Sequence, residues 1–202
     1  MNEQTGNSAS SPEEDRTLVK AFQTGDKTAF DTLVLKHKDK VFNLCYRFLG
    51  DKQEANDCAQ ETFIKVYRSL RKFRFKSAFF TWLYRIAANT CKNKLKSSEY
   101  RRKKKMVPLD NPGRTADQTA LQEIKDPVTS PMAELEKKER MLLIQKAIDA
   151  LPAGQRAVVV LRDIEGLSYE EISSITGLNL GTVKSKLSRA RLELRDRLRG
   201  MI

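Results

Sequence analysis

Apolar residues recur every three or four positions along most of the chain, which is the spacing of one buried face of an α-helix. No stretch alternates apolar and polar residues for long, as a half-buried strand would. The pattern therefore predicts an all-α fold. The predicted helices span residues 12–24, 26–49, 51–70, 77–95, 130–151, 153–165, 168–176 and 181–198.

The segment 101–130 breaks this periodicity and divides the chain. It contains three prolines, one glycine and few large apolar residues. A stretch of about 30 residues without periodicity is long for a loop inside one compact domain. We therefore expect a flexible linker there, a disordered tail over residues 1–10, and two small helical domains over residues 11–100 and 131–202.

The charge of the chain points to its partners. Lys and Arg number 38 against 26 Asp and Glu, which gives a formal net charge of +12. Such an excess favours a polyanionic partner, and nucleic acid is the usual one. No apolar run approaches the roughly 18 residues of a membrane-spanning helix, and the polar, acidic N-terminus is unlike a secretory signal. The composition predicts a cytosolic protein that binds nucleic acid.

Cysteine and histidine give no sign of a metal site. Cys45, Cys58 and Cys91 occupy apolar positions of predicted helices, and their spacing and odd number fit neither a CxxC site nor a disulfide framework. The single histidine, His37, falls on the buried face of the second helix. We expect all four to be core residues, and we expect no metal and no cofactor.

Residues 168–199 form the strongest local motif. A short helix begins with the capping pair Ser168 and Glu171, ends at Gly177, and leads through a short crossover into a longer helix. Two helices joined by a short glycine-containing turn are typical of a helix-turn-helix, whose second helix enters the major groove of DNA. The outward residues of that helix would be Lys184, Ser185, Ser188 and Arg189.

A second motif lies between the third and fourth helices, where residues 71–76 read RKFRFK. Rings on which bases stack, interleaved with cations that follow phosphates, suit single-stranded DNA. The alternative is that Phe73 and Phe75 simply plug the core. Arg85, Asn89, Lys92 and Lys96 then form a polar stripe along one face of the fourth helix.

The third helix has a second face, opposite its apolar stripe, that is not expected to pack in the core. Opposite the apolar stripe recur Asp57, Gln60, Glu61, Ile64 and Arg68, and the surrounding surface is acidic although the chain is basic. A protein partner would explain both the charge and the exposed isoleucine. A single stray exposed apolar residue is the alternative.

Catalytic motifs are missing from the sequence. It contains no HExxH, no GxxxxGK[ST] and no nucleophile elbow. We therefore expect no enzyme and no small-molecule substrate.

Four strings together resemble the extracytoplasmic-function (ECF) sigma factors of bacteria, and among these the sigma-E type. They are DCAQETFIKVYRSLRKF, SAFFTWLYRIAANTCKN, ALPAGQRAVVVLRDIEGLSYEEIS and GTVKSKLSRAR, which begin at residues 57, 77, 150 and 181. The resemblance covers nearly the whole chain from residue 13, apart from most of the linker. It implies a sigma region 2 domain over residues 11–100 and a sigma region 4 domain, with the helix-turn-helix, over residues 131–202.

The resemblance also implies a role for each surface. The third helix would dock on the clamp coiled coil of the largest subunit of RNA polymerase through Asp57, Gln60, Glu61, Phe63 and Ile64. The loop and the fourth helix would recognise and open the −10 element through Phe73, Arg74, Phe75, Lys76, Arg85, Asn89 and Lys92. The helix-turn-helix would read the −35 element through Lys184, Ser185, Ser188 and Arg189.

A factor of this kind would be a monomer when free and would work with core RNA polymerase on promoter DNA in the cytoplasm. The resemblance further implies control by an anti-sigma factor, which in some systems lies in the inner membrane. The residues identify neither that protein nor the promoter sequence.

Two other functions stay open from the residues alone. A stand-alone helix-turn-helix repressor or activator would need a dimer interface or a ligand pocket, and size-exclusion chromatography would reveal its dimer. An RNA-modifying or RNA-cleaving enzyme would use the basic helices as a substrate groove, and a nuclease assay would reveal its activity.

Overall fold

A computed structural model of the chain describes residues 12–97 and 131–199. These residues are helical and contain no strand, so the all-α prediction is confirmed for them. The tail predicted over residues 1–10 and the linker predicted over residues 101–130 lie outside the described part of the chain.

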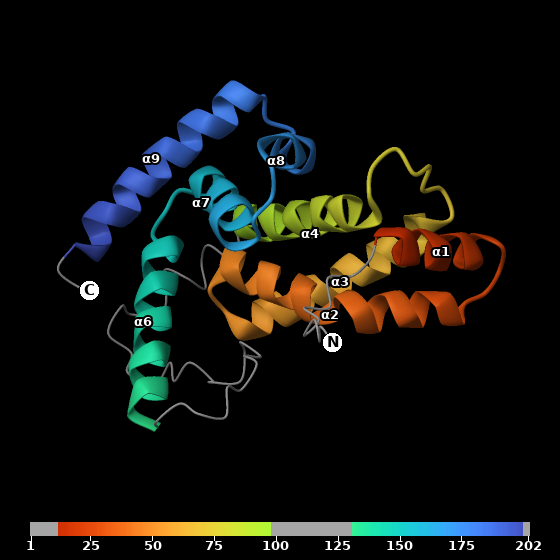
Figure 1. Ribbon diagram of the computed structural model, residues 1–202, viewed down its shortest axis with the longest axis horizontal. Helices are drawn as coiled ribbons and strands as arrows, with labels where there is room; N and C mark the ends of the chain where they lie inside the picture. The colour runs from red at the N-terminus through yellow and green to blue at the C-terminus, as the bar shows by residue number, and fades with distance from the viewer. Residues whose placement is uncertain (1–11, 98–130, 200–202) are drawn as a thin grey trace, which may run out of the picture.

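The described helices form two groups along the chain (Figure 1). The first group, which we call the N-terminal module, consists of α1 (Pro12–Gln23), α2 (Thr28–Leu49), α3 (Lys52–Leu70) and α4 (Phe79–Lys96). The second group, which we call the C-terminal module, consists of α6 (Pro131–Asp149), α7 (Ala153–Val159), η1 (Val160–Ile164), α8 (Tyr169–Thr176) and α9 (Leu180–Leu198).

Several predicted helix boundaries are correct because capping side chains set them. Asp51 precedes α3, and its side chain accepts a hydrogen bond from the Glu54 backbone N–H. Ser168 and Glu171 form the complete capping box at the start of α8. Each such cap satisfies backbone donors that the first turn of a helix leaves without a partner.

Other boundaries differ from prediction by one or more residues, for example the start of α2 at Thr28 and the end of α6 at Asp149. α4 begins at Phe79 rather than at residue 77, and the N-cap residue Ala78 has a non-helical ψ of 147° and makes no side-chain cap. α9 begins at Leu180, one residue early, because the Asn179 side chain caps it through the Thr182 N–H. The predicted helix 153–165 is α-helical only to Val159, and its last turn, η1, is a π-helix.

α2 forms the centre of the N-terminal module. It packs against α1, α3 and α4 (Figure 1). Its apolar stripe, which includes Leu33, Val41 and Leu44, is buried as the periodicity predicts. On α3, Tyr67 has the spacing of the buried apolar residues, yet it is exposed at the edge of Phe22 and Phe30.

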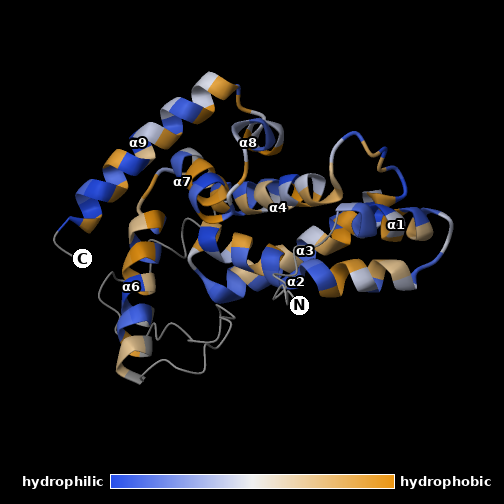
Figure 2. Ribbon diagram, in the orientation of Figure 1, coloured by the Kyte–Doolittle hydropathy of each residue, from blue (hydrophilic) through white to orange (hydrophobic). Residues whose placement is uncertain are grey.

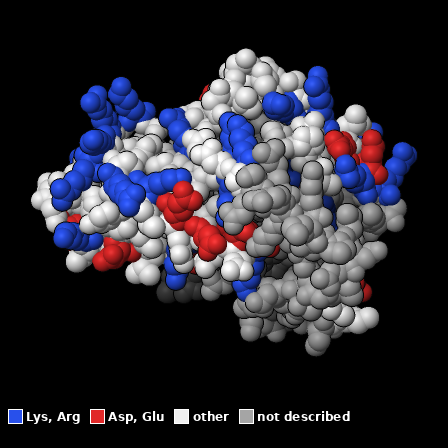
Figure 3. Space-filling model, turned by 180° about the vertical axis from the view of Figure 1, so that it is seen from behind, with Lys and Arg blue, Asp and Glu red and all other residues white. Residues whose placement is uncertain are grey.

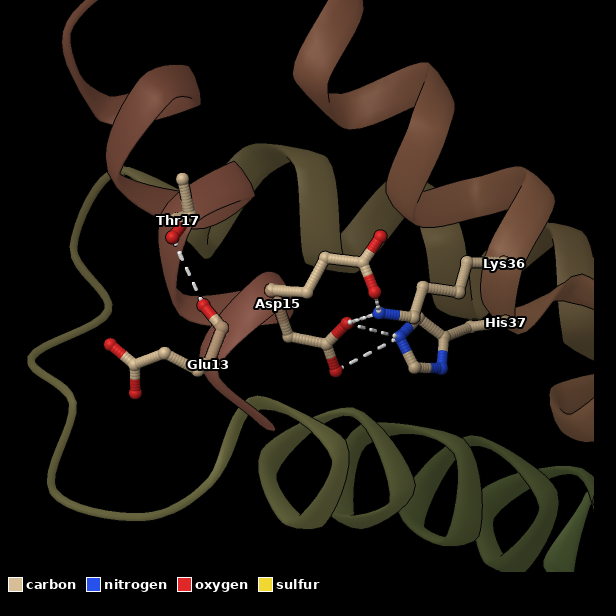
Figure 4. A network of polar contacts seen from close by, with 6 residues as sticks. Glu13, Asp15, Thr17, Lys36 and His37 are labelled. Carbon is tan, nitrogen blue, oxygen red and sulfur yellow. Dashed lines mark hydrogen bonds and ion pairs between the residues drawn. The ribbon is translucent and has the colours of Figure 1, made fainter. Parts of the chain in front are cut away.

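His37 lies in the core of this module, as predicted, and it ties α1 to α2 (Figure 4). Its Nε2 atom is 3.1 Å from both carboxylate oxygens of Asp15, and the Lys36 Nζ atom is 2.8 Å from the same carboxylate. Burial alone would raise the pKa of Asp15, but the hydrogen bonds and charges of His37 and Lys36 outweigh it and lower that pKa. The group thus stays an anion in a buried place.

The three cysteines are also core residues, as predicted. Cys45, Cys58 and Cys91 come from α2, α3 and α4 respectively, and all are buried free thiols. They pack as small apolar side chains where these helices meet.

The C-terminal module rests on the N-terminal module. α8 and α7 pack on α4, while α6, α7 and η1 contact α2 (Figure 1). Apolar side chains of both modules belong to one continuous buried cluster, and orange, apolar segments occur along helices of both modules in Figure 2. The two predicted helical units therefore contact each other directly, and both α4 and α2 of the N-terminal module face the C-terminal module.

Candidate nucleic-acid and polymerase interfaces

The turn between α8 and α9 holds the second helix at a fixed angle. Gly177 adopts a left-handed conformation, with φ of 72°, and closes α8 by donating to the Ser173 carbonyl. The Ser173 hydroxyl in turn donates to the Leu178 carbonyl at 2.6 Å. Residues with a Cβ atom rarely adopt this backbone conformation, which explains the glycine. The helix-turn-helix predicted from the sequence is present.

α9 presents its polar face to solvent. Val183, Leu187 and Ala190 anchor its other face in the core of the C-terminal module. The residues predicted to read DNA are exposed, namely Lys184, Ser185, Ser188 and Arg189. The basic and hydroxyl groups of this face are of the kind that contacts base edges and phosphates in a major groove.

Two neighbouring contacts fix α9 from outside its apolar face. Arg191 makes a two-pronged contact with the Asp163 carboxylate of η1, with its Nε atom 3.0 Å from Oδ2. Lys184 lies over the Tyr169 ring, with Nζ 5.7 Å from the ring centroid, and Arg162 lies over the same ring at 4.8 Å. Arg191 therefore positions the helix, while Lys184 sits at the edge of its outward face.

The loop between α3 and α4 separates its two phenylalanines. Phe73 is buried and packs on Trp82, with ring centroids 4.8 Å apart. Phe75 is half-buried against Phe73, at 5.0 Å between centroids. Arg74 and Lys76 are exposed. The alternative that these phenylalanines fill the core is therefore correct for Phe73 and only partly correct for Phe75.

Phe75 is the one described residue other than glycine with a positive φ, at 54°. Such a conformation is uncommon for a residue with a Cβ atom, and it persists where the surrounding structure enforces it. Gln23 braces the loop by donating to the carbonyls of Leu70 and Phe73 at 3.0 and 2.9 Å. The loop is thus a fixed shape built on buried rings.

The polar stripe of α4 continues from this loop. Asn89 and Lys92 are exposed, while Arg85 is half-buried and its guanidinium donates to the Ser174 hydroxyl of α8. The three residues are spaced by four and three positions, so they lie on one side of the helix. One predicted DNA-binding residue, Arg85, is therefore engaged by the C-terminal module.

The candidate partner face of α3 is exposed as predicted. Asp57, Gln60 and Glu61 are exposed, and 51% of the Ile64 surface is accessible to solvent. Phe63 is half-buried against the core. The face keeps its acidic residues beside an apolar one, although Lys65 pairs with Glu61 at 2.7 Å.

The charged side chains are unevenly spread over the surface. Seen from behind, Lys and Arg gather towards both ends of the molecule, while Asp and Glu form smaller groups between and beside them (Figure 3). Within the described ranges, no group of three or more His, Cys, Asp or Glu could hold a metal ion. Among the same residues, no helix is long and apolar enough to span a bilayer.

Sequence reasoning missed the polar residues between the two modules. The Tyr84 hydroxyl donates to the Glu165 carboxylate at 2.7 Å, and Arg156 donates to the Phe48 carbonyl at 2.6 Å. Tyr84 continues an apolar stripe on α4, so periodicity alone marks it as core. Arg156 is buried, and its position as a lone cation in an apolar helix was the one signal in the sequence for a buried polar contact there.

Two family descriptions match the chain in the order of its modules. Residues 33–102 match "Sigma-70 region 2", and residues 141–194 match "Sigma-70, region 4". The first match spans most of α2, α3, the loop and α4, and the second spans the helix-turn-helix.

Curated relatives extend the likeness over nearly the whole chain. The chain is 43% identical to the RNA polymerase sigma-H factor of Pseudomonas aeruginosa over 179 residues, covering 89% of this chain and 91% of that protein. It is 38% identical to the ECF RNA polymerase sigma-E factor of Escherichia coli K12 over 188 residues, covering 93% and 96% respectively.

Solved structures agree with the fold. CnrH, in complex with the cytosolic domain of CnrY, matches with a TM-score of 0.64 and 25% identity over 92% of this chain and 97% of that one. The sigma factor RpoE of Bartonella quintana, in complex with the anti-sigma factor NepR, matches with a TM-score of 0.63 and 22% identity over 85% and 97%. With its matched regions and its relatives taken together, the chain belongs to the ECF sigma factors of the sigma-70 family.

Proposed function

We propose that this sigma factor, a transcription initiation factor by its family, works through three separate surfaces. The face of α3 binds core RNA polymerase, the loop 73–76 with α4 binds and opens the −10 element, and α9 reads the −35 element. The observation that carries the proposal is that exposed residues suited to each task stand on rigid helices of two modules: Ile64 on α3, Asn89 on α4 and Arg189 on α9.

The α3 surface has the chemistry of a protein interface. A half-exposed isoleucine surrounded by acidic residues loses water from its apolar surface when a partner covers it. Asp57, Gln60 and Glu61 form a polar rim that fits a basic or polar partner surface. We assign Phe63 the role of supporting Ile64 from below, since it is half-buried against the core.

The loop and α4 have the chemistry of a single-strand site. The exposed cations Arg74, Lys76 and Lys92 attract phosphates, and the half-buried Phe75 ring offers a stacking surface. Phe73 acts indirectly, by holding Phe75 in place. Extruding a base costs a few kcal/mol, which stacking and hydrogen bonds in a preformed site offset. The Asn89 amide, with donors and an acceptor, suits contacts to a base edge.

The α9 surface supplies affinity for duplex DNA. Lys184 and Arg189 neutralise phosphates or read guanine, while Ser185 and Ser188 make shorter contacts. Each surface alone is small. When polymerase holds both modules on the promoter, the second DNA contact becomes intramolecular and gains a high effective concentration.

Control by an anti-sigma factor belongs to the same proposal. CnrH was solved with the cytosolic domain of CnrY, and it shares the fold of this chain. A protein of that class would mask the α3 face and the DNA-binding surfaces together. We place this chain in the cytoplasm, where such a partner would retain it, at the inner membrane if the partner is anchored there.

One experiment tests the three assignments together. Ile64→Ala, Asn89→Ala and Arg189→Ala proteins are compared with wild type in transcription by core polymerase on a genomic promoter library. Ile64→Ala should weaken binding to core polymerase at least about tenfold, as for a central interface residue. Asn89→Ala should impair strand opening more than duplex binding, and Arg189→Ala should relax selection of the −35 element.

The control is Leu135→Ala, which removes an apolar side chain of similar exposure, 49%, from α6. It should bind polymerase as wild type does. Wild-type polymerase affinity for Ile64→Ala would contradict the docking surface, and wild-type transcripts from the other two variants would contradict the DNA contacts.

A further inference from the structure

The two DNA-binding modules are joined by an interface that includes polar groups from both. The Tyr84 side chain is fully buried in α4, and its hydroxyl donates to Glu165, which follows η1, at 2.7 Å. On α2, the Phe48 carbonyl accepts from Arg156, and Arg47 donates to Gln145 of α6 at 3.3 Å. Apolar side chains pack around these contacts in one continuous cluster.

This arrangement cannot hold both promoter elements at once. By their names the −10 and −35 elements lie about 25 base pairs apart, which is about 85 Å at 3.4 Å per pair. α9 has 19 residues and is therefore about 28 Å long at 1.5 Å per residue. Because α8 touches α4, the helix-turn-helix lies far too close to α4 to span that distance. The modules must separate before both bind DNA.

The closed arrangement also occupies a DNA-binding residue. Arg85 of α4 donates to the Ser174 hydroxyl of α8, so α8 lies over part of the polar stripe. Nucleic acid and the C-terminal module therefore compete for the same guanidinium. The closed chain is a form with a partly covered single-strand site.

We propose that the C-terminal module is an intramolecular inhibitor of the N-terminal module, and that the Tyr84–Glu165 hydrogen bond is the latch between them. The inference rests on the proposed function, because that function makes the covered face of α4 a DNA-binding site. The closure itself is a property of the free chain. Opening exposes Glu165 to water, and closing requires its carboxylate to be desolvated against the Tyr84 hydroxyl.

The two groups of the latch affect closure in opposite directions: the Tyr84 hydroxyl favours it as a hydrogen-bond donor, and the Glu165 charge opposes it. Burial raises the pKa of Glu165 more than the Tyr84 hydrogen bond and the charges of Arg47 and Lys40 lower it, so the negative charge opposes closure. Burial and the nearby carboxylate raise the pKa of Tyr84 far above its ordinary value, so its hydroxyl stays a donor. Removing the donor and removing the charge should therefore shift closure in opposite directions.

The test measures closure in the full-length protein without DNA or polymerase. Hydrogen–deuterium exchange is followed in residues 79–88 and 169–176, which face each other in α4 and α8. Tyr84→Phe keeps the ring and deletes the donor, and it should speed exchange there about tenfold, equal to about 1.4 kcal/mol. Glu165→Gln keeps an acceptor for the Tyr84 hydroxyl and removes the charge, so it should slow exchange.

Tyr67→Phe is the matched control, because Tyr67 lies in the N-terminal module and 43% of its surface is exposed. It should leave exchange at both segments unchanged. A second, surface variant avoids any core change: Ser174→Arg places like charge beside Arg85 and should also speed exchange. Ala133→Arg adds the same charge at an exposed position of α6 and should not.

DNA binding then connects closure to function. A fluorescent 20-nucleotide thymidine strand should bind Tyr84→Phe and Ser174→Arg about tenfold more tightly than wild type, since apparent affinity scales with the open fraction. Wild-type exchange in both of these variants, or faster exchange in both Tyr84→Phe and Glu165→Gln, would overturn the latch. Faster exchange without tighter strand binding would keep the latch and refute the assignment of α4 as the strand site.

Discussion

Phe75 shows how a single residue can be held in a conformation that its side chain disfavours. Its φ of 54° lies in the left-handed region, while Phe73 and the Arg16 guanidinium, 5.6 Å from its ring centroid, surround the ring. A left-handed conformation costs a residue with a Cβ atom about 1 to 2 kcal/mol. The strain sits in the loop that we assign to the opened strand.

A pair of substitutions at this position tests the strain. Phe75→Gly and Phe75→Ala both remove the ring, but only alanine keeps the unfavourable Cβ atom. The glycine variant should therefore be more stable by about 1 kcal/mol in urea unfolding. The same pair at Arg74, which has no positive φ, should show the opposite order, since alanine restricts the unfolded chain more. A more stable alanine variant at Phe75 would show that the loop is unstrained.

The residue types predicted an aromatic and basic loop, but they did not predict which side chains are buried. The sequence places Phe73 and Phe75 equally in an aromatic and basic loop, yet Phe73 is buried and Phe75 is half-buried. Tyr67 fits the buried stripe of α3 but is exposed, while Thr62 takes the core position and donates to the Cys58 carbonyl at 2.7 Å. Spacing predicts the centre of an apolar helix face well, but residues at its border are buried only where a neighbouring helix packs on them.

The helices as elements follow closely from local sequence. Ser168 and Glu171 form the capping box of α8, and Gly177 ends that helix. Asn179 caps α9 and sets its first residue. These effects act within four residues along the chain, so they can be read without knowledge of the fold. The π-helical turn of η1 is different, because nothing in its sequence breaks the helical pattern.

The cap of α9 supports the recognition helix and can be tested directly. Asn179→Ala removes the acceptor for the Thr182 N–H, 2.8 Å away, and should cost about 1 kcal/mol in urea unfolding of the C-terminal module. Asn179→Asp keeps a side-chain acceptor and should stay within a few tenths of wild type. An equal loss in both variants would mean that packing rather than capping sets this helix start.

At the scale of the whole molecule, charge couples the arrangement of the two modules to pH. The pKa of Glu165 is raised in the closed arrangement because burial outweighs the effects of Tyr84, Arg47 and Lys40. When the modules separate, that pKa returns towards the value of an exposed glutamate, about 4.3. Between these two pKa values the closed form binds more protons than the open form.

Linkage then fixes the direction of the pH effect. Closure should strengthen as pH falls through this window and should be weakest above the raised pKa, where Glu165 is charged in both forms. Small-angle X-ray scattering of the free protein should show a smaller radius of gyration at the lower pH. Glu165→Gln should lose this dependence. Two outcomes would contradict the assignment to Glu165. In one, the wild-type protein opens on acidification and Glu165→Gln does not; in the other, Glu165→Gln still becomes more compact at the lower pH.

The order of the helices, the caps at Asp51 and Ser168 and the helix-turn-helix were determined by the sequence, because periodicity, capping and turn chemistry act between residues close along the chain. The family was indicated by the resemblance of four sequence strings to the ECF sigma factors. The contact between the two modules was decided only by the tertiary structure. Tyr84 and Glu165 are 81 residues apart, and Arg156 and Phe48 are 108 residues apart. Such pairs follow from how finished helices pack, since burial and desolvation depend on every neighbour at once.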